Sequence, residues 1–78
     1  MKQIYLNNKD ERTLEKILDY KDGWGELNHF TIRRTYIGQE GNSSILYCNV
    51  VGYANLQKIY TKELPIILRL KIKIKEMM

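Results

Sequence analysis

The 78-residue sequence is poor in the residues that most often build chemical sites, with one cysteine, one histidine, one proline and one tryptophan. The single Cys48 excludes an intramolecular disulfide, and one cysteine with one histidine cannot form a four-ligand zinc site. Glycine-rich phosphate loops and the HExxH and CxxC motifs are absent as well. We therefore expect no metal, no cofactor and no enzymatic activity, and we interpret Cys48 as a buried structural thiol.

The sequence also lacks long apolar runs. No stretch approaches the roughly 20 apolar residues of a membrane span, and the N-terminal residues do not resemble a signal peptide. We expect a cytoplasmic protein that does not bind a membrane. The 78 residues, 44% of them apolar, predict one small folded domain over residues 1–78.

Charge is distributed unevenly along the chain, whose formal net charge is +4. Residues 1–28 carry five Lys and Arg against six Asp and Glu, whereas residues 64–78 carry four against one. The N-terminal part is therefore mildly acidic and the C-terminal part basic, which favours an anionic surface as partner of the latter.

The first third of the chain predicts a short strand followed by a helix. Residues 2–6 alternate in the manner of a strand. Asn8 is placed to cap a helix, with Glu11 as the second member of a capping box. The predicted buried stripe of this helix is Leu14, Ile17 and Leu18, and the glycines at 23 and 25 end it.

The middle and end of the chain predict three further strands and a second helix. Residues 29–37 and 44–53 are β-rich and are separated by a turn at residues 39–42, which predicts an antiparallel hairpin. Residues 55–63 fit a short helix capped by Asn55, with an irregular strand as the alternative. Residues 66–75 alternate apolar and basic side chains, so a strand there would carry four cations on one face.

The predicted order is therefore β-α-β-β-α-β, the order of a ferredoxin-like α+β domain. In that fold both helices cover one face of a four-stranded, mostly antiparallel sheet. The first and third strands are central, and the basic last strand lies at an edge. The opposite face of the sheet is open, and we expect function there.

The predicted open face combines aromatic and basic side chains. Tyr5 and Tyr47 would lie on it, with Arg69, Lys71 and Lys73 of the edge strand and either Arg33 or Arg34 of the second strand beside them. Aromatic platforms bordered by cations hold single-stranded bases. Residues 4–8, Ile-Tyr-Leu-Asn-Asn, resemble the first-strand motif of the RNA-recognition family, which implies base stacking on the sheet. Residues 43–50 depart from the third-strand motif of that family, because they contain one aromatic residue and no glycine.

Three further features are candidates for a site. Trp24, between two glycines, is either an anchor for a protein partner or a plug over the end of the first helix. Arg33, Arg34 and Tyr36 resemble the Arg/Tyr/Lys sets of small ribonuclease toxins, which implies phosphate stabilisation. His29 has no neighbouring residues with metal-ligand or triad spacing.

These features favour binding over catalysis. We expect a small interaction protein, of the kind that viruses or mobile elements encode. It would regulate or inhibit a larger protein complex, whether or not that complex handles nucleic acid. The expected binding residues are Tyr5, Trp24, Arg33, Tyr47, Arg69, Lys71 and Lys73. A single-stranded nucleic-acid binder is the alternative, a ribonuclease-type toxin is third, and a homodimer is compatible with the sequence.

Overall fold

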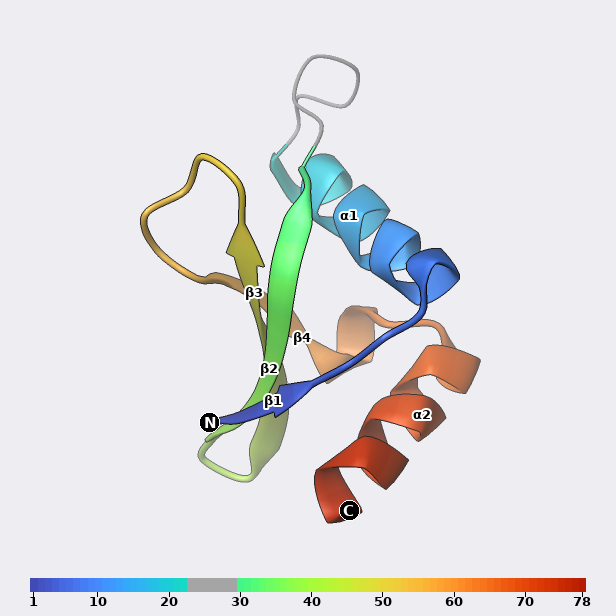
Figure 1. Cartoon of the computed structure of the whole chain (residues 1–78). Helices are drawn as coiled ribbons and strands as arrows, with labels where there is room; N and C mark the ends of the chain where they lie inside the picture. The colour runs from blue at the N-terminus through green and yellow to red at the C-terminus, as the bar shows by residue number, and fades with distance from the viewer. Residues whose placement is uncertain (23–29) are drawn as a thin grey trace.

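The computed structural model describes residues 1–22 and 30–78. Within them the chain forms a four-stranded antiparallel sheet, two α-helices and one 3₁₀ turn (Figure 1). The elements in chain order are β1 (Lys2–Ile4), α1 (Asn8–Asp22), β2 (Ile32–Glu40), β3 (Ser43–Val50), β4 (Gln57–Tyr60), η1 (Thr61–Glu63) and α2 (Ile66–Met77). The α+β class is thus confirmed.

The ferredoxin-like order is not confirmed, because the two elements that follow β3 are exchanged. Residues 57–60, predicted to be helical, form strand β4, and residues 66–77, predicted to include the last strand, form helix α2. The sheet order is β1-β2-β3-β4, so β1 lies at an edge instead of the centre. Every pair of neighbouring strands is antiparallel.

The predicted first helix is confirmed, with a correction to its cap. Leu14 and Leu18 are buried in the core, and Ile17 is partly buried against it. The side chain of Asn7, not Asn8, caps the helix, since its Oδ1 accepts a hydrogen bond of 2.8 Å from the Asp10 amide. This contact satisfies one of the free N–H groups of the first turn.

Two acidic residues of α1 bind backbone amides at and just before the start of β2. The Ile32 amide donates to a Glu15 carboxylate oxygen at 2.9 Å, and the Phe30 amide donates to Asp19 at 3.3 Å. The two carboxylates are four residues apart and so lie on the same side of the helix. They hold the first residues of β2 against α1.

The β2–β3 hairpin is confirmed and ends in a two-residue turn. Glu40 pairs with Ser43, and Gly41 between them has φ +64°. Asn42 has no positive φ, so the pattern is that of a type II′ turn, whose first central position favours glycine. The turn fixes a register in which Leu46 faces Ile37 and Cys48 faces Thr35.

The strand predicted for residues 66–75 is wrong, because these residues form part of helix α2. The alternation of apolar and basic residues suggested a strand. Leu68 and Ile72, one helical turn apart, are 3% and 2% exposed, whereas Leu70 and Ile74 are 57% and 59% exposed. A strand would have placed all four on one face. Pro65 precedes the helix, and its carbonyl accepts the first helical hydrogen bond from the Arg69 amide at 2.9 Å.

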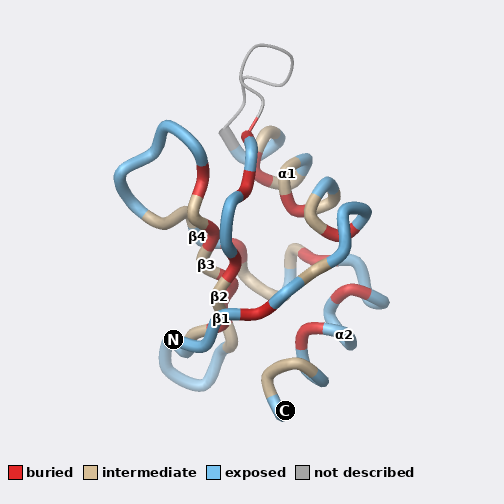
Figure 2. The backbone as a smooth tube through the Cα atoms, viewed as in Figure 1, coloured by how far each residue is buried: buried red, intermediate tan, exposed pale blue. Residues whose placement is uncertain are grey.

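Both helices cover the same face of the sheet, and the core lies between them and the strands (Figures 1 and 2). Leu46, Cys48 and Ile59 supply its centre from β3 and β4. An ion pair of 3.2 Å between Asp10 of α1 and Lys71 of α2 connects the two helices. Among the described residues, no helix has both the length and the apolar character that crossing a bilayer requires.

Candidate functional site: the tyrosine face

The face of the sheet turned away from the helices carries three tyrosines from three consecutive strands. Tyr36 of β2 pairs directly with Tyr47 of β3, and Tyr60 of β4 pairs with Ile45 of β3. These positions alternate with the buried Ile37, Leu46, Cys48 and Ile59, so they point to the opposite face. We call the surface formed by Tyr36, Tyr47 and Tyr60 the tyrosine face.

A glycine lets the Tyr47 ring lie across the sheet. A Cβ atom on Gly38 would stand 2.6 Å from Cε2 of Tyr47 and 3.2 Å from Cγ of Met1. Real side chains do not approach so closely, and the ring therefore occupies the space that a larger residue at 38 would fill. Gly38 pairs with Ile45, which is 1% exposed although it lies outside the helix-side core. The tyrosine face thus has a small apolar base of its own.

One cation on this face is paired with an acid, and others lie near the tyrosine rings, among them Lys62, whose ammonium is 6.0 Å from the centroid of the Tyr60 ring. The Lys58 ammonium forms an ion pair of 3.1 Å with Glu40 and lies 5.9 Å from the centroid of the Tyr47 ring. The hydrogen bond and the charge of Glu40 raise the pKa of Lys58 above its ordinary value of 10.5. Arg34, paired with Asn49 across the strands, is the other basic residue that strand alternation places on this face. The surface is aromatic and polar rather than strongly cationic.

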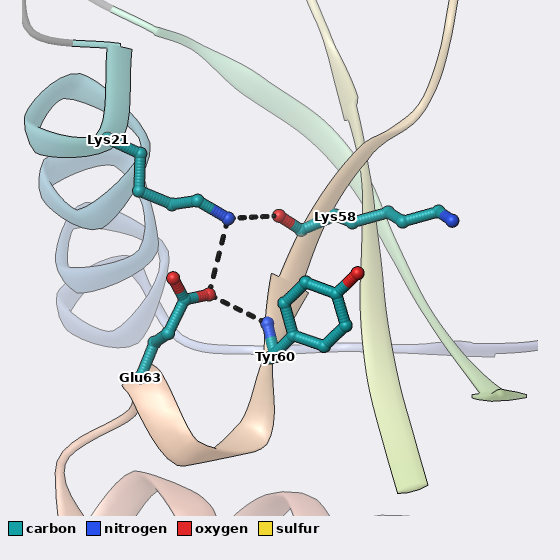
Figure 3. A network of polar contacts seen from close by, with 4 residues as sticks. All are labelled: Lys21, Lys58, Tyr60 and Glu63. Atoms are coloured by element: carbon teal, nitrogen blue, oxygen red, sulfur yellow. Dashed lines mark hydrogen bonds and ion pairs between the residues drawn. The ribbon is translucent and has the colours of Figure 1, made fainter. Parts of the chain in front are cut away.

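The free edge of the sheet next to Tyr60 is closed by a polar network (Figure 3). The Tyr60 amide donates to a Glu63 carboxylate oxygen at 2.8 Å, and the Lys58 carbonyl accepts from the Lys21 ammonium at 3.0 Å. Lys21 and Glu63 are themselves 3.3 Å apart. Side chains therefore satisfy backbone groups that an edge strand would otherwise offer to another chain.

The structure separates the residues that the sequence had grouped into one site. Tyr47 lies on the tyrosine face, and Tyr5 lies beyond the end of β1, where it lines a shallow cleft with Arg33. Arg69, Lys71 and Lys73 lie on α2, on the other side of the sheet (Figure 1). The expected row of cations beside the tyrosines is therefore wrong, because its premise was an edge strand. Trp24 and His29 lie outside the described residues.

Sequence reasoning considered Tyr36 only in a ribonuclease-like set with Arg33 and Arg34, and it missed Tyr60 and Lys58. The position of Tyr36 could have been predicted. In a strand, side chains two residues apart point to the same face, so Tyr36 faces outward if Arg34 does. The positions of Tyr60 and Lys58 could not be predicted, because residues 55–63 were assigned to a helix, where the two side chains belong to different surfaces.

Cys48 is a buried thiol, as predicted. Its side chain is fully buried in the core, and burial raises its pKa to about 12, an effect that the positive charge of Lys21 partly opposes. A thiol in this state is protonated at neutral pH and is a poor nucleophile. In residues 1–22 and 30–78, no three His, Cys, Asp or Glu residues are grouped so that they could hold a metal ion.

No protein family, curated protein sequence or solved structure matches this chain.

Proposed function

We propose that this chain is a small, non-enzymatic interaction protein that docks on a larger protein through its tyrosine face. The observation that carries the proposal is the row of half-buried tyrosines from β2, β3 and β4 on the face that the helices leave uncovered. Tyrosine is enriched among the residues that dominate protein interfaces, since its ring supplies apolar area and its hydroxyl a hydrogen bond.

The charge balance supports a protein partner over single-stranded nucleic acid. Binding of a phosphate backbone depends on unpaired cations that follow the strand. Here Lys58 is paired with Glu40, and the three cations expected beside the tyrosines lie on α2, across the sheet. Arg34 and Lys62 remain near the tyrosines, which is fewer cations than a row that follows a nucleic-acid strand. The expected partner surface is apolar at its centre, with hydrogen-bond acceptors for the tyrosine hydroxyls.

Site-specific photocrosslinking tests the proposal. A photoreactive amino acid replaces Tyr36 on the tyrosine face or, as the control, Tyr20, which is exposed on α1. Extract of the source cells is used with and without nuclease. We expect a nuclease-resistant adduct with a discrete protein from position 36 and none of the same identity from position 20.

Affinity for the purified partner then supplies the quantitative criterion. Tyr36→Ala and Tyr47→Ala should each weaken binding at least about tenfold, which is the range of interface hot spots, whereas Tyr20→Ala should leave it unchanged. Gly38→Ala should also weaken binding. The added Cβ atom would force the Tyr47 ring out of its position on the sheet, although the tyrosine itself is still present. Equal affinities of all variants would refute the docking surface.

Titration with labelled poly-dT and poly-U distinguishes the alternative. We expect weak oligonucleotide binding that disappears at high salt and does not respond to Tyr47→Ala. Binding that persists at high salt and loses about 1–3 kcal/mol for each tyrosine replaced would instead establish base stacking on this face.

A further inference from the structure

Helix α2 has a second apolar surface, which points away from the core. Only Leu68 and Ile72 of this helix are buried, while five of its other apolar side chains, and that of Met78 directly after it, are more than half exposed. We call these six the apolar ridge: Ile66, Ile67, Leu70, Ile74, Met77 and Met78. At about 100° per residue the six positions span roughly 120° of the helix surface, centred about opposite the buried pair.

Cations border the apolar ridge on both sides. The same helical spacing places Arg69 and Lys73 along one side and Lys71 and Lys75 along the other. Lys71 is partly neutralised by its ion pair with Asp10. Glu76, the acid of this helix, turns toward the sheet, where its carboxylate accepts hydrogen bonds from Ser44 and Gln39.

The ridge lies at the outer margin of the molecule. Figure 1 shows α2 with the sheet on one side and no described element on the other, and Figure 2 shows exposed residues along its outer turns. The ridge follows a helix that is about 18 Å long at 1.5 Å per residue. Near its C-terminal end, Ile74 and Met78 also line a cleft with Leu6, Asn7 and Asp10, yet both side chains remain more than half exposed.

We propose that the apolar ridge binds the surface of an anionic lipid bilayer, with α2 lying parallel to the membrane plane. Aliphatic and methionine side chains would enter the boundary between headgroups and acyl chains, and the bordering Lys and Arg side chains would extend upward to the lipid phosphates. The proposal replaces the expectation of no membrane contact, which rested on the absence of an apolar span. Here only one side of the helix leaves water.

Charge argues for this occupant over the alternatives. A second copy of the chain packed on the same ridge would bring two sets of cations together, which repel one another. A protein groove would need acidic residues along both rims to match the two cationic borders, whereas an anionic bilayer presents negative charge on every side of an inserted helix. Basic, amphipathic helices with these features bind membrane interfaces.

Sedimentation with lipid vesicles tests the proposal. Vesicles of phosphatidylcholine containing roughly one third phosphatidylserine are compared with vesicles of pure phosphatidylcholine. We expect binding to the anionic vesicles that weakens when salt is raised from about 50 to about 300 mM, as for other charge-assisted surface contacts, and little binding to the neutral ones.

Two matched pairs of variants locate the contact. The double variant Leu70→Gln/Ile74→Gln should lower vesicle affinity about tenfold or more, because it removes apolar groups that insert, while Tyr20→Gln on α1 should not. Lys73→Gln should lower it about fivefold, the usual contribution of one cation near an anionic surface, while Arg12→Gln on α1 should have little effect. All five substituted positions are exposed, so thermal unfolding should confirm that the four variants remain folded.

Three results would overturn the proposal. The native protein could fail to bind anionic vesicles, it could bind neutral vesicles with equal affinity, or the Leu70→Gln/Ile74→Gln variant could bind anionic vesicles as tightly as the native protein. Ridge-dependent binding of an acidic amphipathic peptide without vesicle binding would show that the ridge is a protein interface instead. Tyr47→Ala should bind vesicles like the native protein, because Tyr47 lies on the other side of the sheet. A failure of one proposal is therefore distinguishable from a failure of the other.

Discussion

A pair of leucines two residues apart distinguishes the helix at residues 66–77 from the strand that the sequence favours. Leu68 is 3% exposed and Leu70 is 57% exposed. In a strand the two side chains share a face, and their replacement by alanine would have similar costs. In the helix their directions differ by about 200°, so the costs should differ greatly.

The magnitudes follow from burial. Leu68→Ala should lower the free energy of unfolding by about 3 kcal/mol, since it removes a fully packed side chain and leaves a cavity. Leu70→Ala should change it by less than about 1 kcal/mol, because most of the side chain is already in water and alanine is the better helix former. The expected difference is about 2 kcal/mol or more.

Urea unfolding followed by circular dichroism at neutral pH measures both values. A 78-residue domain has a total stability of about 4–12 kcal/mol, so Leu68→Ala can leave too little folded protein for a reliable curve. The milder pair Ile72→Val and Ile74→Val then replaces it, with about 1 kcal/mol expected at the buried position and about zero at the exposed one. Equal losses within either pair would refute the helix and the exposed ridge that depends on it.

Three further predictions concern single contacts. Because burial raises the pKa of Cys48 from 9.0 to about 12, the unfolded chain loses the thiol proton first as pH rises. The free energy by which the native protein is more stable to unfolding than Cys48→Ala should therefore be constant below about pH 8.5. It should fall by about 2 kcal/mol by about pH 10.5. A difference that does not change with pH would show that the thiol is not protected. Glu63→Ala should cost about 1–2 kcal/mol and increase aggregation, because it frees the Tyr60 amide at the sheet edge, whereas Glu40→Ala, which breaks only an exposed ion pair, should cost less than about 0.5 kcal/mol in the same unfolding and light-scattering measurements. Asn7→Ala should lower the free energy of unfolding by about 1 kcal/mol and Asn8→Ala by less, since Asn7 provides the side-chain cap; the reverse order in urea unfolding would contradict that assignment.

The sequence by itself determined the first helix, the β2–β3 hairpin and the state of Cys48. In α1, the apolar spacing of Leu14, Ile17 and Leu18 fits a helix and no strand, and a cap and acidic residues precede it. In the hairpin, glycine at the turn and β-rich flanks agree with each other. In these segments the local conformational preferences and the pattern of apolar residues favour the same secondary structure. Long-range contacts were therefore not needed to choose between a helix and a strand.

The secondary structure of residues 55–77 was decided only by the tertiary structure. The order of apolar and polar residues there fits both the two-residue repeat of a strand and the 3.6-residue repeat of a helix. Leu68 and Ile72, four residues apart, satisfy both a strand that alternates and a helix with a narrow buried stripe. Once β4 completes the sheet, α1 and α2 together cover its inner face, and packing of Leu68 and Ile72 against it selects the helix (Figure 1).

That choice also relocated the candidate sites. The three cations that a strand would have placed beside Tyr47, namely Arg69, Lys71 and Lys73, border the apolar ridge of α2 instead. Tyr60 faces outward only because residues 57–60 are extended. The sequence shows which residue types are present. The side of the sheet on which each of them lies depends on long-range packing, and the spacing of apolar residues does not predict that packing.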